Sequence, residues 1–297
     1  MKSLQISRYL LILAIVCFCL LSPASAGELA AAHPKFPGLF PQLDSGTRPV
    51  AAPIEDQAIP AGSSRSASQS QKRAETLTLS QLLRKYPETI KTQGPRRKHI
   101  ALTFDDVPDP RFTPQVLDVL RRHHVHATFF VVGSRAEKHP DLVARMIKEG
   151  HAIGNHSYNH PKFGEISVNA FRTQIIRTEN IINTMAGYKP RLIRPPYGDI
   201  SEQQLKWAKV HGYKLVNWNV DSLDWKGLSK SQVRNNIITH AGKGSIILQH
   251  GGGGRGSNLR GTIQALPEVI NIMRKRGYTF VTVPQMLQVS KEKEVRK

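Results

Sequence analysis

The sequence predicts an α/β fold in which parallel strands alternate with helices. From residue 99 to residue 283, short apolar runs alternate about seven times with longer segments of helical pattern. Two residues mark helix ends in that stretch, because Pro114 stands in the first turn of one expected helix and Gly150 closes another. A parallel α/β barrel and an open doubly wound sheet both produce this alternation, and no short-period internal repeat is visible.

The residue pattern sets the order of the elements. Strands are expected at 99–104, 126–133, 151–156, 191–196, 213–220, 245–250 and 278–283. Helices are expected at 113–124, 139–150, 167–186, 201–212, 229–241 and 262–277. The loops that lead from strand to helix would then open on one face of the fold.

Composition excludes two classes of protein. Of the 297 residues, 39% are hydrophobic and 22% are charged, which is too apolar for a fully disordered chain. Only one long apolar run is present, which excludes a membrane protein with several spans. A formal charge of +20 raises nucleic acid as a partner. However, the basic residues are dispersed and are not interleaved with aromatic residues, so we expect no nucleic-acid partner.

The first 26 residues are typical of a signal peptide. Lys2 and Arg8 precede an apolar run at 9–21, and small residues at 24–26 form a cleavage site. The run is shorter than the ~20 residues that a membrane span needs, although an uncleaved anchor is the alternative. Cleavage would remove both cysteines of the chain, lower the formal charge from +20 to +18 and imply export.

The next segment has the composition of a linker. Residues 27 to about 75 are rich in Ala, Pro, Ser and Gly without a steady period, which indicates a flexible spacer. A short amphipathic helix is expected near 77–86, ending at about Pro87. The chain is thus divided into a signal peptide (1–26), a spacer (27–97), an α/β domain (98–290) and a charged tail (291–297).

Residues that carry chemistry gather where the expected strands end. They are Asp105 with Asp106, His156 with His160, Arg194 before Pro-Pro-Tyr-Gly, Asp221 with Asp224 and Trp225, and His250 before four glycines. In parallel α/β folds these strand ends open on one face, where active sites form. Each of these residues alone also fits a solvated loop, so their clustering at the strand ends is the stronger indication of an active site.

Two of these groups indicate a metal site. His156 and His160 have the i, i+4 spacing that places two imidazoles on one face of a helical turn, although two surface histidines fit the same spacing. Asp105 or Asp106 would supply the third ligand, because a His₂–carboxylate set suits a hydrolytic divalent metal. One carboxylate can then bind the metal while the other takes a proton from water.

The remaining strand-end residues leave alternatives open. Arg194 lies in a loop stiffened by two prolines, where it would pair with a carboxylate or simply face solvent. His250 is a candidate general acid, although a lone histidine is more often structural. The glycines at 251–254 lack the Lys-Ser/Thr of a phosphate-binding loop and indicate a flexible loop.

Taken together, these residues resemble the polysaccharide deacetylases, the NodB-homology domain of carbohydrate esterase family 4. The similarity runs from about residue 99 to residue 287 and contains the family's five motifs in order. They are TFDD (103–106), HSYNH (156–160), RPPYG (194–198), DSLDW (221–225) and LQH (248–250). The resemblance implies a distorted (β/α)₇ barrel, in agreement with the alternation of strands and helices.

The resemblance also assigns a metal site and a base. Asp106, His156 and His160 would bind one divalent metal ion, with zinc as the first choice and cobalt, nickel or manganese as alternatives. Asp105 would be the catalytic base, and Arg194 would orient and charge-stabilise it.

Further roles follow from the same resemblance. The backbone N–H of Tyr197 would help to bind the oxyanion. Asp224 would tune His250, the general acid, and Trp225 and Leu248 would wall the acetyl pocket.

One position departs from the family pattern. The first motif usually continues Asp-Asp-Gly-Pro, whereas this chain has Asp-Asp-Val-Pro at 105–108. If a glycine at this position served a positive φ, the β-branched Val107 would be strained there. The alternatives are a reshaped loop and an ordinary negative φ, and activity is expected because the metal and acid/base positions are intact.

The expected function is therefore that of a secreted, metal-dependent deacetylase of N-acetylglucosamine-containing glycans, with peptidoglycan as the first choice. Chitooligosaccharides, an exopolysaccharide and O-acetyl xylan are alternative substrates, and a catalytically weak carbohydrate-binding protein is the alternative class. We expect the protein at the cell wall or cell surface, where anionic wall polymers, and not nucleic acid, would be the partners of its positive charge. We expect a monomer without a membrane partner once the signal is cleaved.

Overall fold

The structure is a computed structural model that describes residues 77–293. The expected signal peptide and most of the expected spacer lie outside the described residues. The strands are β1 (Ile90–Lys91), β2 (His99–Val107), β3 (Thr128–Val131), β4 (Ala152–Asn155), β5 (Leu192–Ile193), β6 (Lys214–Val216), β7 (Val220–Asp221), β8 (Ser245–His250) and β9 (Thr279–Phe280). The helices are α1 (Leu79–Lys85), α2 (Thr113–Arg122), α3 (Gly133–Lys138), α4 (Pro140–Lys148), α5 (Val168–Ala186), α6 (Glu202–Val210), α7 (Lys230–His240), α8 (Arg260–Lys275) and α9 (Val283–Leu287). Three short 3₁₀ turns are η1 (Phe163–Glu165), η2 (Pro196–Gly198) and η3 (Asp224–Lys226).

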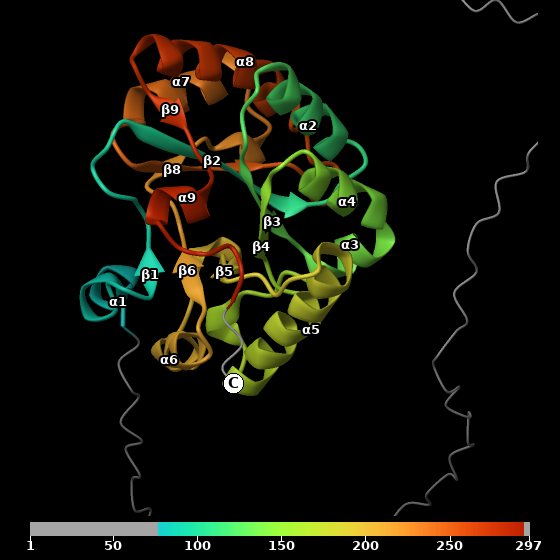
Figure 1. Ribbon diagram of the computed structural model, residues 1–297, viewed down its shortest axis with the longest axis vertical. Coiled ribbons are helices and arrows are strands. Elements are labelled where there is room, and N and C mark those ends of the chain that lie inside the picture. Colours follow the sequence, from blue (N-terminus) through green and yellow to red (C-terminus); the bar gives the residue numbers. More distant parts are fainter. Residues whose placement is uncertain (1–76, 294–297) are drawn as a thin grey trace, which may run out of the picture. The chain divides into compact units, whose positions relative to one another are not determined.

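The strands form one parallel sheet that curls into a half-barrel. Their order is β1-β6-β5-β4-β3-β2-β8-β7, with β9 beside β2. Figure 1 shows the longer helices arranged around the outside of the strands. The α/β barrel interpretation is thus confirmed over the open doubly wound sheet. Because the strands are parallel, all their carboxyl ends lie at one end of the half-barrel.

Strand β2 shows how the residue pattern sets the two faces of the sheet. Successive side chains of a strand point to opposite faces. Leu102 and Phe104 belong to the large cluster of buried side chains outside the sheet, whereas Ala101 belongs to a separate cluster inside it. Thr103 and Asp105 follow Ala101 at the two-residue spacing of the inner face. The interior therefore changes from apolar to polar toward the carboxyl end of β2.

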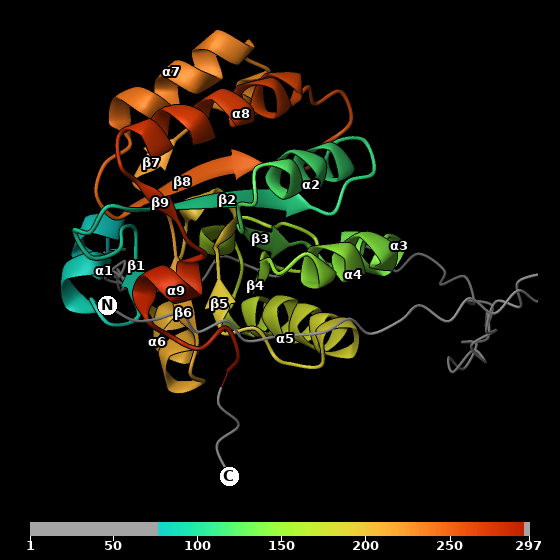
Figure 2. The same cartoon turned by 45° about the horizontal axis from the view of Figure 1, so that its top comes forward.

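The core has an outer and an inner part. The outer clusters join the sheet to α2, α4, α7 and α8 in one region and to α1, α5 and α6 in another. Figure 2 shows α7 and α8 on one side of the half-barrel and α5 on the other. The inner cluster is closed by α9, whose Val283 and Met286 lie in one cluster with Phe130 and Val216. The interior is filled by side chains, as in other α/β barrels.

The segment at 213–220 differs from the single strand expected there. It forms two strands, of which β6 pairs with β1 and β5, whereas β7 pairs with β8. Between them, Asn217 Nδ2 donates to the carbonyl of Gly198 at 3.0 Å, and Asn219 Oδ1 accepts from the N–H of Ile246 at 2.9 Å. These amide side chains take hydrogen bonds that a continuous ladder would otherwise make. Helices α3 and α9 were not expected, because each is too short to show an amphipathic period.

The fold begins earlier than the boundary expected at residue 98. Helix α1 lies in the range where a short helix was expected, and its N-cap Thr78 forms a capping box with Gln81. Leu82 and Ile90 are buried in one cluster, and β1 pairs with β6. The stretch from α1 to β1 is therefore packed into the fold, although its sequence alone placed it in the spacer. Within residues 77–293, no helix combines the length and apolarity that crossing a membrane requires.

Candidate active site

A cavity of about 560 Å³ opens at the carboxyl ends of the strands. Its lining includes all the site residues expected from the sequence except two, Arg194 and Asp224. Those two are buried behind the lining, where each contacts a residue that faces the cavity. The structure therefore brings the strand-end residues together in one place.

Three of them form a compact group that can hold a metal ion. Ligand atoms of Asp106, His156 and His160 all lie within 4.8 Å of one another. Asp106 Oδ1 is 3.2 Å from His160 Nε2 and 3.7 Å from His156 Nε2. His156 is buried and the other two are partly exposed, so the group is open to the cavity from one side.

Unusual backbone conformations aim these ligands. Asp106 and His160 have φ values of 61° and 63°, in the left-handed region that residues other than glycine rarely adopt. The pairing of β2 with β3 shifts register between Phe104 and Val107, which is a bulge at the two aspartates. The His160 turn is held by Ser157, whose Oγ accepts from the N–H of His160 at 3.0 Å. Strain of this kind is typical of functional sites.

The donor set fits a divalent cation. His156 Nδ1 lies 2.8 Å from the carbonyl oxygen of Arg194, which can only accept, so Nδ1 carries the proton and Nε2 is left as a lone-pair donor toward Asp106. Burial, and then the neighbouring His160, lower the pKa of His156 to about 3, which keeps its ring neutral. Two imidazoles and one carboxylate are a ligand set of hydrolytic metal sites.

Asp105 is paired with a fully buried arginine. Arg194 Nη1 donates to Asp105 Oδ1 at 2.8 Å and to Thr103 Oγ1 at 2.7 Å. Arg194 also donates to two backbone carbonyls and stacks over the ring of Phe130 at 4.1 Å, so its side chain is fixed on all sides. Burial raises the pKa of Asp105, and the Arg194 guanidinium opposes that rise. A carboxylate with a raised pKa is a better proton acceptor than an exposed one.

His250 is paired with a buried carboxylate in the same way. His250 Nδ1 lies 2.7 Å from Asp224 Oδ1, and Asp224 Oδ2 accepts from the N–H of His250 and from Thr262 Oγ1. Burial opposes charge on the imidazole, but the charge and hydrogen bond of Asp224 outweigh it and raise the pKa of His250 to about 9. Residues 105 and 250 are register partners on adjacent strands, so the two pairs stand side by side.

This pairing gives an expected pH dependence. A general acid must be protonated, so activity should fall as pH rises through the pKa of His250 at about 9. Asp224→Asn removes the charge that raises this pKa, which should then fall toward the ordinary value of 6.5. The pH profile of kcat, measured for the wild type and for Asp224→Asn, gives the pH at which each protein loses activity on the alkaline side. An alkaline limb at the same pH in both proteins would contradict the pairing.

The other expected residues form the cavity walls. Tyr197 has a positive φ of 58° in η2, and its ring packs edge-on against His160 with centroids 4.9 Å apart. Trp225 is 55% exposed, whereas Leu248 on β8 is 4% exposed. The Trp225 ring is therefore accessible to a ligand, and Leu248 forms part of the buried wall of the cavity. An exposed aromatic ring beside a cavity is a natural platform for a sugar.

Val107 is accommodated without strain. It is the last residue of β2 and is fully buried. Among the described residues, the positive φ at this turn belongs to its neighbour Asp106 and not to Val107. Of the two alternatives left open by the sequence, the negative φ is the one found. A Cβ on Gly251 would come within 2.6 Å of Val107 Cγ1, so the valine packs directly against the start of the glycine-rich loop.

We therefore expect that Val107→Gly lowers stability and does not improve catalysis. Removing a fully buried valine side chain and loosening a strand should together lower the free energy of unfolding by about 2–4 kcal/mol. Denaturant unfolding and acetate release measure the two effects. A variant that gained activity several-fold would instead mean that Val107 limits this site.

Sequence reasoning missed the residues that fix the glycine-rich loop after His250. Asp109 is 4% exposed and accepts from Arg111, Arg135 and the N–H of Gly253, whose carbonyl accepts from both arginines. A Cβ on Gly252 would come within 2.0 Å of the carbonyl of Asp106, so this glycine permits close approach to the backbone of Asp106. The loop is thus held in place rather than free. In the sequence only the glycines indicated this loop, because Asp109, Arg111 and Arg135, which hold it, lie far from it along the chain.

Comparisons with known proteins identify the family of this chain. The polysaccharide deacetylase family matches residues 92–216. Over 202 residues the chain is 48% identical to a peptidoglycan-N-acetylglucosamine deacetylase of Bacillus cereus, covering 68% of this chain and 73% of that protein. The chain belongs to the polysaccharide deacetylase family. It is accordingly a hydrolase that acts on amide bonds, as the family resemblance implied.

Two further relatives extend the comparison. This deacetylase is 40% identical over 205 residues to the peptidoglycan-N-acetylmuramic acid deacetylase PdaC of Bacillus subtilis, covering 69% of this chain but only 42% of that protein. It also matches the crystal structure of the Bc1960 peptidoglycan N-acetylglucosamine deacetylase, bound to an N-hydroxybenzamide, with a TM-score of 0.70 and 45% identity. That match covers 73% of this deacetylase and 100% of the solved chain.

Proposed function

We propose that this polysaccharide deacetylase is a secreted, metal-dependent enzyme that removes acetyl groups from N-acetylglucosamine residues of peptidoglycan. The observation that carries the proposal is one cavity lined by a candidate metal-binding group, by Asp105 with the buried Arg194 behind it, and by His250 with the buried Asp224 behind it. Amide hydrolysis needs an electrophile, a base and an acid within reach of one carbonyl.

Asp106, His156 and His160 would hold the metal, with zinc as the first choice. A divalent metal at such a site supplies Lewis-acid polarisation of the acetamide carbonyl and lowers the pKa of bound water. The ligands come from the ends of β2 and β4, which lie on either side of β3, and the acetamide would lie between the group and the cavity mouth. Leu248 then offers the small apolar surface that an acetyl methyl requires.

The base and the acid would come from the two adjacent pairs, Asp105–Arg194 and His250–Asp224. Asp105 takes the proton of the attacking water, and Arg194 holds the carboxylate in place while it does so. The backbone N–H of Tyr197, turned by the positive φ of that residue, helps to bind the developing oxyanion. His250 gives its proton to the departing amine, because an amine is a poor leaving group until it is protonated. Acetate and a free amino sugar are the products.

Peptidoglycan is favoured as the substrate by two of the relatives reported above, whose names state an N-acetylglucosamine and an N-acetylmuramic acid position of peptidoglycan. The higher identity, 48% against 40%, supports the N-acetylglucosamine position. Export is supported by the basic and apolar pattern of the first 26 residues. An enzyme outside the cell would meet peptidoglycan directly.

The test is acetate release from a panel of peptidoglycan, chitin oligosaccharides and acetylated xylan, each with and without chelator. We expect the highest kcat/KM on peptidoglycan and loss of release in chelator. Higher kcat/KM on either other glycan would assign a different substrate. Binding to peptidoglycan without acetate release from any glycan would instead support a carbohydrate-binding protein.

A further inference from the structure

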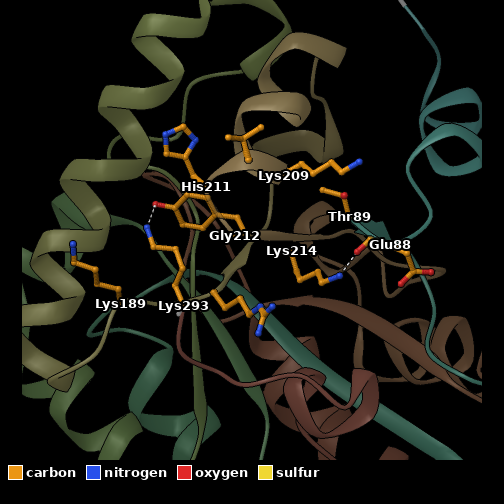
Figure 3. A pocket seen from close by; sticks show the side chains of 11 residues that line it. Glu88, Thr89, Lys189, Lys209, His211, Gly212, Lys214 and Lys293 are labelled. Carbon is orange, nitrogen blue, oxygen red and sulfur yellow. Dashed lines mark hydrogen bonds between the residues drawn. The ribbon is translucent and has the colours of Figure 1, made fainter. Parts of the chain in front are cut away.

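A second cavity, of about 670 Å³, lies at the other end of the strands from the active site. Its lining comes from the residues just before β1 and β5, the start of β6, the end of α6 and Lys293 near the C-terminus. Because the strands are parallel, these amino ends face away from the carboxyl ends that carry the catalytic groups. Figure 3 shows side chains from these separate segments around the cavity, among them Lys189, Lys209, Lys214 and Lys293.

The lining carries an excess of positive charge. Its cationic residues are Lys189, Arg191, Lys209, Lys214 and Lys293. Against them stand Glu88, which lines the cavity with an 85% exposed side chain, and Glu179, which is buried beneath it. Glu179 also accepts from the hydroxyl of Tyr213 at 2.6 Å. The two carboxylates are fewer than the four lysines of the lining, so the lysines are only partly neutralised.

The cations differ in how they are engaged. Lys189 and Lys293 share the single carboxylate of Glu179. Lys214 donates to a neutral acceptor, the carbonyl of Glu88. Burial and the charges of Arg191 and Lys91 lower the pKa of Lys214, and the charge of Glu88 only partly offsets that effect. Lys209 is exposed beside the ring of Tyr86. Lys209 and Lys214 are thus the lysines of this lining that an anionic ligand reaches without breaking an ion pair with Glu179.

We propose that this basic pocket binds a segment of a linear polymer of phosphodiesters. Lysine ammoniums are point charges that suit phosphate, and cations contributed by separate segments match a ligand with successive charges. A cavity of about 670 Å³ has the size of a ligand site and is far larger than a single phosphate needs. Its concave shape fits a chain, whereas a planar lipid surface cannot enter it.

Binding there would leave the catalytic cavity open. A polymer held at the amino ends of the strands does not compete with a glycan at the carboxyl ends, so the pocket would keep the enzyme at a polyanionic surface during turnover. The proposal goes beyond the proposed function and does not depend on which glycan is deacetylated.

The test uses the full chain and a fluorescently labelled glycerol-phosphate oligomer, with binding measured by polarisation at several salt concentrations. Lys209→Gln combined with Lys214→Gln should weaken binding about tenfold or more at low salt and reduce its salt dependence. The control, Lys138→Gln combined with Lys148→Gln, removes the same charge from exposed lysines of α3 and α4 and should bind like the wild type. Both double variants should release acetate from chitin oligosaccharides at the wild-type rate.

Three comparisons decide what the pocket recognises. Poly-glutamate of matched charge and inorganic phosphate should each bind more weakly than the oligomer, and phosphatidylglycerol vesicles should bind both double variants equally. Equal affinity for poly-glutamate would make the pocket an unspecific anion site and overturn the phosphodiester assignment. Saturation by inorganic phosphate at the same affinity would overturn the polymer assignment. Equal loss of oligomer binding in the two double variants would assign binding to net charge and refute the pocket.

Discussion

Asp105→Asn is expected to lower kcat for acetate release by about 10²–10⁴-fold, the range typical of a lost general base. The amide cannot take a proton from water, but its oxygen can still accept from Arg194 Nη1, which donates to Asp105 Oδ1 at 2.8 Å in the wild type. Asn is therefore preferred to Ala, because Ala would leave a fully buried guanidinium without this acceptor. Acetate release at saturating substrate measures the effect.

Two further measurements separate loss of the base from loss of the site. Metal content by mass spectrometry should match the wild type, because Asp105 is not assigned as a ligand. Thermal unfolding reports how much stability the pair with Arg194 contributes. The matched control, Asp141→Asn, removes one carboxylate from the exposed start of α4 and should keep full activity. A folded, metal-loaded Asp105→Asn variant with wild-type kcat would refute the assignment of the base.

His160→Ala should lower metal affinity by more than about 100-fold, since loss of even an outer-shell partner typically costs 10–100-fold. Its Nε2 lies 3.2 Å from Asp106 Oδ1, and the residue is only partly buried, so the fold should survive the truncation. We expect turnover to fall to the level that the wild type shows in chelator. Metal titration of the stripped protein, followed by calorimetry, measures the affinity directly.

His240→Ala is the control for this prediction. His240 is exposed at the end of α7, outside the active-site cavity, so its truncation should leave metal affinity and turnover unchanged. If His160→Ala kept wild-type metal affinity, the ligand set would need another residue in place of His160. If both variants lost metal equally, the loss would come from general destabilisation.

The fold and the list of site residues follow largely from local sequence. Alternating apolar runs give the strands of a parallel sheet, and polar residues at the ends of those runs then meet at one edge. Asp105 and His250 illustrate this, because they are far apart in sequence but become register partners on β2 and β8. Roles came from the family motifs, since spacing alone left the histidines open between metal ligands and surface residues.

The features that the sequence did not predict depend on contacts between segments that are distant along the chain. The clamp of Asp109 and Arg135 on Gly253 joins three stretches of chain that have no common pattern. The division of 213–220 into β6 and β7 depends on hydrogen bonds between the side chains of two asparagines and backbone groups elsewhere in the fold. Val107 could not be judged from its residue type, because its φ is set by the bulge at Asp106.

The most direct test of the central claim is restoration of peptidoglycan deacetylation by added metal. The full chain is stripped with chelator, titrated with zinc on purified peptidoglycan, and followed by acetate release and by analysis of muramidase fragments. We predict that activity returns in proportion to zinc up to one ion per chain, with free amino groups on glucosamine residues. Undiminished acetate release by the fully stripped protein, or deacetylation confined to muramic acid, would contradict the account.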